Sequence, residues 1–509
     1  MDRQPAAADT RVVLEAQQPL SRSLLWSVQR EFYRRNGPRA FGDGLVPYYI
    51  TNNPFIAAAY ADVIGAWQRE LGAPVNVVEL GAGSGRFAFS LAKALAAEDV
   101  RFHYVVTDFA EDNLALLRGH PSLRALADAG RLDFARFDAG GDRAPRLDGG
   151  RPLDGPLVVV ANYVFDSLPH DAFRFADGRA ARARVTLRSA QPEPDLADAG
   201  LLTRLELAYD YQPLDGPAYD EPELDRVIDE YRARLDGTTL SFPCAALRAL
   251  RALAELAGGR LLLVTADKGY HRDDELLGRG DPPLAIHSGA FSMGVNYHAI
   301  DRWFAHAGGE SLHAAHCHAS LHVAAFALGA GGPELRRAFR RSVERFGPDD
   351  FHTLELFVER HSDRLTLADA LAAVRMSGWD ARLFHACLPS MLAALDEAGE
   401  GERRELRRVL RLVWDHYYPI GEAEDLAFAI AVALYRLGDY ADALTFCARS
   451  TELYGERAAT HFYVGLCRYQ LGQAEPALAH FERALAIDPA HEAAKAMRVR
   501  LRAQAATRV

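Results

Sequence analysis

The sequence predicts an α/β domain with a doubly wound parallel sheet, followed by an α-helical domain. Three observations support this division. Short apolar segments alternate with helical stretches from about residue 75 to residue 270, as in a parallel sheet whose strands are joined by helices. A glycine-rich turn follows the first of these segments. From about residue 424 the chain resembles itself at an interval of 34 residues, which is typical of stacked helix pairs.

Composition narrows the class of protein. A chain of 509 residues is too long for one hydrophobic core, so two or three domains are expected. The net charge of −11, without a Lys/Arg run, argues against a nucleic-acid partner. The chain has no long apolar run and no apolar signal core near residue 1, so we expect neither a membrane span nor secretion. Its five scattered cysteines are typical of reduced thiols in the cytoplasm, and its richness in Ala and Arg is typical of a GC-rich bacterial genome.

The first strand and its turn carry the strongest signal. Residues 75–80 are an apolar strand that brings Glu79 to the carboxyl edge of the sheet. The turn that follows lets the backbone bend sharply and approach a ligand closely. A helix over residues 87–96 would then point its first N–H groups toward a bound molecule. The glycines of the turn are Gly81, Gly83 and Gly85.

The second strand supplies a candidate partner for this turn. It closes on Asp108, which lies 23 residues after Gly85, about where such folds place a carboxylate for ribose hydroxyls. A helix over residues 111–118 follows it, and Asp138 closes the third strand. The strands predicted after the first are residues 102–108, 131–138, 156–162, 259–267 and 320–328.

A long insertion separates the fourth and fifth strands. Asp177-Gly178 between alternating segments predicts a β-hairpin, and residues 221–235 and 244–256 are helical in composition. We expect this insertion, at about residues 170–257, to shape a substrate pocket at the ligand edge of the sheet.

The remainder of the chain is predicted to be helical. Gly332-Pro333 marks a boundary, which gives a first domain at 1–331, a helical connector at 332–420 and repeats at 421–509. The segments that begin at Leu437 and Leu471 share a pattern that resembles tetratricopeptide repeats. Such stacks usually offer concave surfaces to peptides or proteins, so a peptide or protein partner is expected; dimerisation of the chain is the alternative.

The turn E-x-G-x-G-x-G resembles motif I of class I, Rossmann-like S-adenosylmethionine (SAM) methyltransferases. In the rival dinucleotide fingerprint, G-x-G-x-x-G, the third glycine comes one residue later. The resemblance implies that Glu79 and the glycines hold the methionine and ribose portions, with Asn162 among the cofactor-binding residues. Asp108 would accept hydrogen bonds from the ribose diol. Phe109 would lie beside the adenine, and Asp138 would take the adenine amino group.

The fourth strand leads into a segment with a narrower resemblance. Asn162, Asp166-Ser-Leu-Pro169 and Phe173 resemble the N-E-x-x-D-A-L-P-x-x-x-F signature of the MidA-like methyltransferases, relatives of the mitochondrial complex I assembly methyltransferase. Residues 49–54, 266–270 and 295–298 are similar, in order, to its F-I-T-x-P-E, I-D-Y-G-Y and V-D-F-T segments.

This resemblance implies SAM-dependent methylation of a peptide or protein side chain. Tyr163 and Asn296 stand where the family has acids, which argues for an acceptor less basic or smaller than arginine. Candidate catalytic residues are Asp166, Tyr163, and His170 or His298 as general base. The alternatives are a small-molecule O- or N-methyltransferase of secondary metabolism and a non-catalytic SAM-binding assembly factor.

Four histidines near residue 320 raise the question of a metal. No cysteine or carboxylate pattern completes a ligand set around them, so we predict no metal site. They are His313, His316, His318 and His322.

Overall fold

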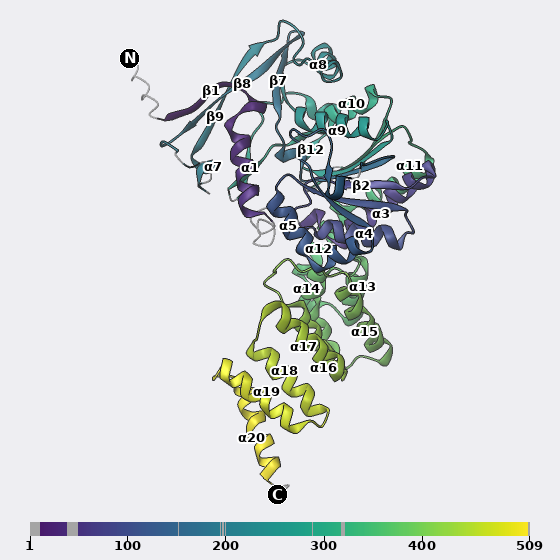
Figure 1. Ribbon diagram of the computed structural model, residues 1–509, viewed down its shortest axis with the longest axis vertical. Helices are drawn as coiled ribbons and strands as arrows, with labels where there is room; N and C mark the ends of the chain where they lie inside the picture. The colour runs from purple at the N-terminus through teal and green to yellow at the C-terminus, as the bar shows by residue number, and fades with distance from the viewer. Residues whose placement is uncertain are drawn as a thin grey trace. The chain divides into compact units, whose positions relative to one another are not determined.

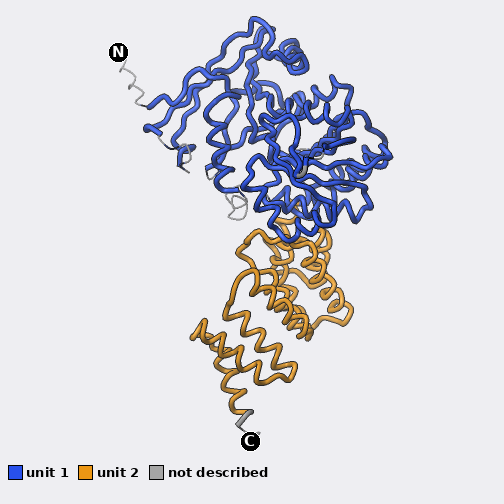
Figure 2. Tube along the Cα trace, viewed as in Figure 1, with its two compact units in different colours: residues 1–351 blue, residues 352–509 orange. Residues whose placement is uncertain are grey.

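The computed structural model describes residues 11–37, 49–150, 152–193, 195, 198, 200–287, 289–316 and 321–506. The chain forms two compact units, residues 1–351 and 352–509 (Figure 2). The first unit is longer than the predicted domain 1–331, because α11 (Pro333–Phe339) packs against α3 (Pro54–Leu71). Trp67 Nε1 donates to the Ala330 carbonyl at 2.7 Å, and the Glu334 N–H donates to Glu70 at 2.7 Å.

The first unit is built on an eight-stranded sheet (Figure 1) with the order β16-β17-β11-β6-β2-β3-β4-β5. The five strands from β11 to β4 are parallel, whereas β17 and β5 run antiparallel to their neighbours. The central strands are buried along their length, which explains why they were recognisable as continuous apolar runs. The strands are β2 (Val75–Glu79), β3 (Phe102–Asp108), β4 (Leu132–Arg136), β5 (Arg146–Leu147), β6 (Leu157–Asn162), β11 (Leu261–Asp267), β16 (Glu310–His313) and β17 (His322–Leu328).

The strand order reverses beside β2. From β2 the chain moves outward through β3 and β4, then returns to form β6 on the other side of β2. In open α/β sheets, ligands bind at the carboxyl ends of the strands on either side of such a reversal. Glu79 ends β2 and Asn162 ends β6, so the topology directs both residues to this crevice.

Helices cover the sheet through apolar side chains. Leu250 of α9 and Ile300 of α10 belong to one buried cluster with Val159 of β6 and Phe326 of β17. Leu25 of α1 packs with Val185 of β8 in a second buried cluster, and the first unit has eight described helices besides α3 and α11. They are α1 (Leu24–Asn36), α4 (Arg86–Ala97), α5 (Glu111–Gly119), α6 (Pro121–Asp128), α7 (Leu201–Arg204), α8 (Pro222–Arg234), α9 (Cys244–Leu256) and α10 (Tyr297–His306).

The insertion forms a second, antiparallel sheet. The predicted hairpin at Asp177-Gly178 is confirmed, with φ of 51° and 68° at the two turn residues. An N-terminal strand, which the sequence analysis did not predict, completes this sheet by pairing with β8. Its strands are β1 (Val12–Pro19), β7 (Asp171–Ala176), β8 (Arg179–Ser189), β9 (Leu205–Pro213) and β10 (Thr238–Phe242), and two small ladders are β12 (Gly269–Tyr270) with β15 (Val295–Asn296) and β13 (Ala285–His287) with β14 (Ala290–Ser292).

The second unit is helical. Gly438 and Gly472 end the first helix of successive pairs with φ of 84° and 77°, which supports the repeat seen in the sequence. Within the described residues, no helix is long and apolar enough to cross a membrane. The helices are α12 (Pro348–Arg360), which begins in the first unit, α13 (Leu367–Met376), α14 (Ala381–Ala394), α15 (Glu400–Asp415), α16 (Leu426–Leu437), α17 (Tyr440–Tyr454), α18 (Ala458–Gln470), α19 (Ala474–Ile487) and α20 (Glu492–Ala506).

Candidate active site

A cavity lies at the carboxyl ends of β2, β3, β4 and β6. All but one of the residues predicted to bind the cofactor line it, and the exception is Gly85, the N-cap of α4. Two of the four predicted catalytic residues, Tyr163 and Asp166, also line it. The cofactor-site residues that line the cavity are Glu79, Gly81, Gly83, Asp108, Phe109, Asp138 and Asn162.

The glycine turn has the backbone that its sequence requires. Gly81, Gly83 and Gly85 have φ of 59°, 55° and 77°, values that L side chains rarely adopt. A side chain at Gly81 would also contact Val164, its Cβ lying 3.5 Å from Val164 Cγ2. The turn therefore keeps bare backbone against the cavity and directs the chain into α4.

Glu79 is buried beside this turn. Tyr104 Oη donates to Glu79 Oε2 at 2.9 Å. Desolvation raises the pKa of Glu79 to about 8, although the Tyr104 hydrogen bond acts in the opposite direction. When no cationic ligand is bound beside it, this carboxyl group is therefore mostly protonated at neutral pH.

Asp108 is fixed at the end of β3. Its Oδ1 accepts from the Ala110 N–H at 2.9 Å, and its Oδ2 accepts from the Asn113 side chain. Burial raises the pKa of Asp108 to about 6, and these hydrogen bonds oppose that shift. At pH 7 the group is therefore mostly ionised and held in one orientation.

The end of β6 is strained. Tyr163 has φ of 52°, in the left-handed region that non-glycine residues seldom occupy. Its N–H donates to the Ala266 carbonyl at 3.0 Å, which holds the residue in place. The preceding Asn162 accepts from Tyr60 Oη at 2.7 Å through Oδ1.

Two buried aspartates form an acid pair at the wall of the cavity. Asp166 lines the cavity, and Asp267, at the end of β11, accepts from the Asp166 N–H at 3.1 Å through Oδ2. Desolvation raises the pKa of both, that of Asp166 to about 6, and the proximity of Asp166 raises that of Asp267 further. Asp267 therefore keeps a proton to a higher pH than an ordinary carboxyl group does, whereas Asp166, with a pKa of about 6, is mostly ionised at pH 7 and can accept a proton.

The two predicted histidine bases lie elsewhere. His170 and His298 are not among the described residues that line the cavity. His170 Nε2 lies 2.8 Å from the Phe165 carbonyl, and burial lowers the pKa of His170 to about 4. His298 Nδ1 lies 2.9 Å from Tyr231 Oη, and its Nε2 lies 3.2 Å from Asp273. Their catalytic roles stay predictions.

Helix α1 contributes a wall that the sequence analysis missed. Gln29, Arg30 and Tyr33 of this helix line the cavity. Gln29 exchanges two hydrogen bonds with the backbone of Phe291, at 2.5 and 2.9 Å. The contact joins residues 262 positions apart, which no local pattern reveals.

Arg30 connects two of the predicted cofactor residues. Its guanidinium lies 4.7 Å from the centre of the Phe109 ring, and its Nη1 lies 2.8 Å from Asp138 Oδ2. The far end of the predicted nucleotide site is therefore bounded by an aromatic ring, a cation and a carboxylate.

The hydrogen-bonding groups of the cavity fit a polar ligand such as SAM. Four buried polar atoms of lining residues have no hydrogen-bond partner among the described residues, so a polar ligand would satisfy them. Two acids, Glu79 and Asp108, belong to the cavity wall, together with the bare backbone of the glycine turn. The unpartnered atoms are Asn52 Oδ1, Asn113 Oδ1, Asn162 Nδ2 and Tyr163 Oη.

Three solved structures are similar to parts of this chain. A protein of unknown function from Burkholderia thailandensis is 18% identical, with a TM-score of 0.41 over 63% of this chain and 90% of its own. A proposed methyl transferase from the same organism, solved with S-adenosyl-homocysteine, is 20% identical, with a TM-score of 0.42 over 64% of this chain and 91% of its own. The tetratricopeptide protein YrrB, described with an unusual peptide-binding site, is 18% identical, with a TM-score of 0.25 over 34% of this chain and 84% of its own.

No curated protein matches the sequence. Residues 423–490 match the tetratricopeptide repeat family. Residues 55–331, just over half of the chain, match the family described as "Putative S-adenosyl-L-methionine-dependent methyltransferase". The match contains β2 to β17 and most of the residues that line the cavity, whereas the wall from α1 lies before it. The chain is therefore a member of this family of SAM-dependent methyltransferases, with SAM as its cofactor.

Proposed function

We propose that this methyltransferase is MidA-like and methylates a side chain of a peptide or protein. The observation that carries the proposal is the single cavity that joins the predicted cofactor residues to the Asp166–Asp267 pair. One wall fits the cofactor, and the other offers a group that can hold an acceptor and take its proton.

Each residue of the cofactor wall has a proposed task. Glu79 and the turn at Gly81 and Gly83 hold the methionine portion. Asp108, oriented by Asn113, accepts hydrogen bonds from the ribose diol. Phe109 and Asp138 flank the adenine. These roles are the ones that the family resemblance implies, and each of the residues named lines the cavity.

The chemistry asks little more of the protein than alignment and removal of a proton. Bound SAM would supply a methyl group that is carried on a positively charged sulfur. The acceptor's lone pair would form the new bond to the methyl carbon, while the electrons of the S–C bond would stay with the sulfur of the departing S-adenosylhomocysteine. Asp166 lies in the cavity wall and accepts the proton that the acceptor loses. Asp267 steadies the negative charge of Asp166 by keeping its own proton.

Of the two positions where the chain lacks the family's acids, only one is among the described residues that line the cavity. Asn296, one of the two lost acids, is buried as the N-cap of α10 and is not among the described lining residues. Only Tyr163 alters the cavity itself. The acid pair remains to recognise a protic nitrogen or oxygen, which is what a polar side chain of a peptide offers.

The helical repeats are the proposed binding surface for the peptide or protein, since such stacks commonly bind chain segments. A homodimer through the same helices is the alternative use.

Four buried cysteines carry free thiols, which supports the cytoplasm as the place of action; Cys317 lies outside the described residues. They are Cys244, Cys387, Cys447 and Cys467.

A labelling experiment tests the acceptor class. Purified enzyme is incubated with methyl-labelled SAM and extract from a deletion strain, and protein is separated from small metabolites. Label in protein is expected. Label only in metabolites would contradict the proposal and favour a small-molecule methyltransferase, a function that the covering of the cavity by α1 also suits.

The Asp166→Asn variant separates chemistry from cofactor binding. It should bind S-adenosylhomocysteine as the wild type does but transfer the methyl group about 100-fold or more slowly, because the base is lost. Undiminished transfer would exclude Asp166 as the base.

A further inference from the structure

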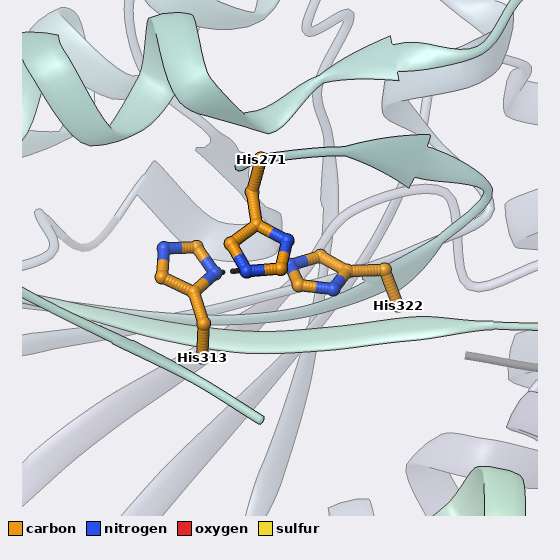
Figure 3. Close-up of side chains that lie close together, drawn as sticks. All are labelled: His271, His313 and His322. Atoms are coloured by element: carbon orange, nitrogen blue, oxygen red, sulfur yellow. Dashed lines mark hydrogen bonds between the residues drawn. The ribbon is translucent and has the colours of Figure 1, made fainter. Parts of the chain in front are cut away.

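Three histidines from separate elements meet beside the sheet (Figure 3). His271 follows β12, His313 ends β16 and His322 begins β17. A nitrogen atom from each ring lies within 4.8 Å of the other two. His313 Nδ1 and His322 Nε2 are 3.0 Å apart, and the His271 ring stacks on both others with centroid distances of 4.4 Å.

This group differs from the one considered in the sequence. The structure adds His271, omits His316 from the group, and His318 lies outside the described residues. The signal was hidden because His271 is 42 residues before His313 and only the fold brings them together. None of the three is among the described residues that line the SAM cavity, so the group is a separate site.

The spacing suits one transition-metal ion. Tetrahedral Zn²⁺ with Zn–N bonds of about 2.0–2.1 Å places its ligand nitrogens about 3.4 Å apart. The observed nitrogens, one pair at 3.0 Å and all within 4.8 Å, are close enough to share one ion once the His271 ring, which stacks on the other two, turns to direct a nitrogen toward them. Without an ion, the close His313–His322 pair must share a proton, whereas a cation accepts the lone pairs of all three rings.

Carboxylates stand behind two of the rings, as in many metal sites. Asp301 Oδ1 lies 3.9 Å from His313 Nε2, the nitrogen that does not face His322. Glu275 Oε2 lies 4.0 Å from His271 Nδ1 of the ring and also accepts from the backbone N–H of His271 at 3.1 Å. Both carboxylate–ring distances exceed a hydrogen bond, so each carboxylate would orient its ring and strengthen the imidazole as a ligand after a shift of about 1 Å.

The group is only partly buried, so an ion can enter it from solvent. His322 is fully buried, whereas the His271 and His313 side chains keep exposures of 14% and 15%. The aromatic rings of Tyr297 and Phe326 pack against the group at centroid distances of 4.8 and 5.3 Å, which keeps water away from the ligands on that side.

We propose that His271, His313 and His322 bind one divalent transition-metal ion, with Zn²⁺ the best match to three imidazole ligands and one open position. The ion ties the segment after β12 to the β16–β17 edge of the sheet. This proposal is independent of the methyl acceptor.

Metal titration of the full-length protein tests the site. After treatment with a chelator and its removal, the protein is titrated with Zn²⁺ by calorimetry and with Co²⁺ by visible absorption. We expect one ion per chain and the intense Co²⁺ bands of a low-coordinate site. His271→Ala and His313→Ala should each weaken Zn²⁺ binding by more than about 100-fold, and Asp301→Asn by about 10- to 100-fold.

The control is His480→Ala. His480 belongs to another histidine pair, with His461 Nδ1 at 3.1 Å, and its loss should leave the stoichiometry and affinity unchanged. Circular dichroism and S-adenosylhomocysteine binding verify that each variant is folded. The proposal is overturned if the wild type binds no ion, if the ligand variants bind as the wild type does, or if binding is lost in His480→Ala.

Discussion

At the scale of single residues, burial sets the charge of Glu79. Its raised pKa of about 8 means that it must release a proton if it is to face the cationic amino group of SAM as a carboxylate. Below about pH 8 the free protein holds this proton, so SAM binding becomes weaker as the pH falls.

We therefore expect SAM affinity to fall roughly five- to tenfold from pH 7.5 to pH 6.5. Calorimetry in buffers of different ionisation enthalpy would measure both the affinity and the protons released. Glu79→Gln should bind more weakly but lose most of this pH dependence. Equal wild-type affinity at the two pH values would contradict the role given to Glu79.

Tyr163 is a second residue whose role can be tested by substitution. Its buried hydroxyl has no partner among the described residues, so removing it should not harm the ligand-free fold. Tyr163→Phe should raise the free energy of unfolding by up to about 1 kcal/mol and slow methyl transfer up to about tenfold, if the hydroxyl bonds a ligand. Denaturant unfolding and single-turnover kinetics check the two effects. A clear loss of stability would show that the hydroxyl is already bonded.

More of the predicted cofactor residues than of the predicted catalytic residues line the cavity. Asp108 was found because strand ends and chain spacing are local properties. Gln29 and Tyr33 were not found, because α1 reaches the cavity only through a contact with Phe291 that the tertiary fold creates. Asn296 was misjudged for a similar reason: its side chain caps α10 and donates to the Ser241 carbonyl at 2.9 Å.

At the scale of elements, the same limit appears. The central strands were predicted because a strand buried on both faces is apolar throughout. The strands β1, β9 and β16 were missed, since they are partly exposed and mix polar with apolar side chains. The α18–α19 pair was anticipated from the interval of 34 residues, and Gly465 shows how closely its two helices approach: an added Cβ would lie 2.6 Å from the Phe481 ring.

Gly465→Ala should therefore destabilise the helical unit by about 1–3 kcal/mol, because Phe481 is fully buried and has little room to move. Gly401→Ala in α15 is the matched control, since its Cβ would meet nothing within 4 Å and alanine favours a helix. Thermal unfolding compares them. Equal stability of the Gly465→Ala variant and the wild type would mean that the two helices are not closely packed.

At the scale of the whole molecule, the two units divide the proposed work. Every described residue that lines the SAM cavity belongs to the first unit. A chain cut after residue 360, which keeps α12 whole, should bind S-adenosylhomocysteine with unchanged affinity but lose most labelling of protein acceptors. Calorimetry and the labelling assay measure the two properties. Full labelling by the shortened chain would exclude the repeats as the acceptor-binding surface.

SAM is proposed to bind at the carboxyl ends of β2 and β3, with Asp108 as an anchor of the ribose. Calorimetric titration of S-adenosylhomocysteine into the wild type and Asp108→Ala tests it most directly. We predict one site per chain and a loss of about 1.5–3 kcal/mol in the variant, the value of hydrogen bonds to a charged group. No binding by the wild type, or equal binding by the variant, would contradict the claim.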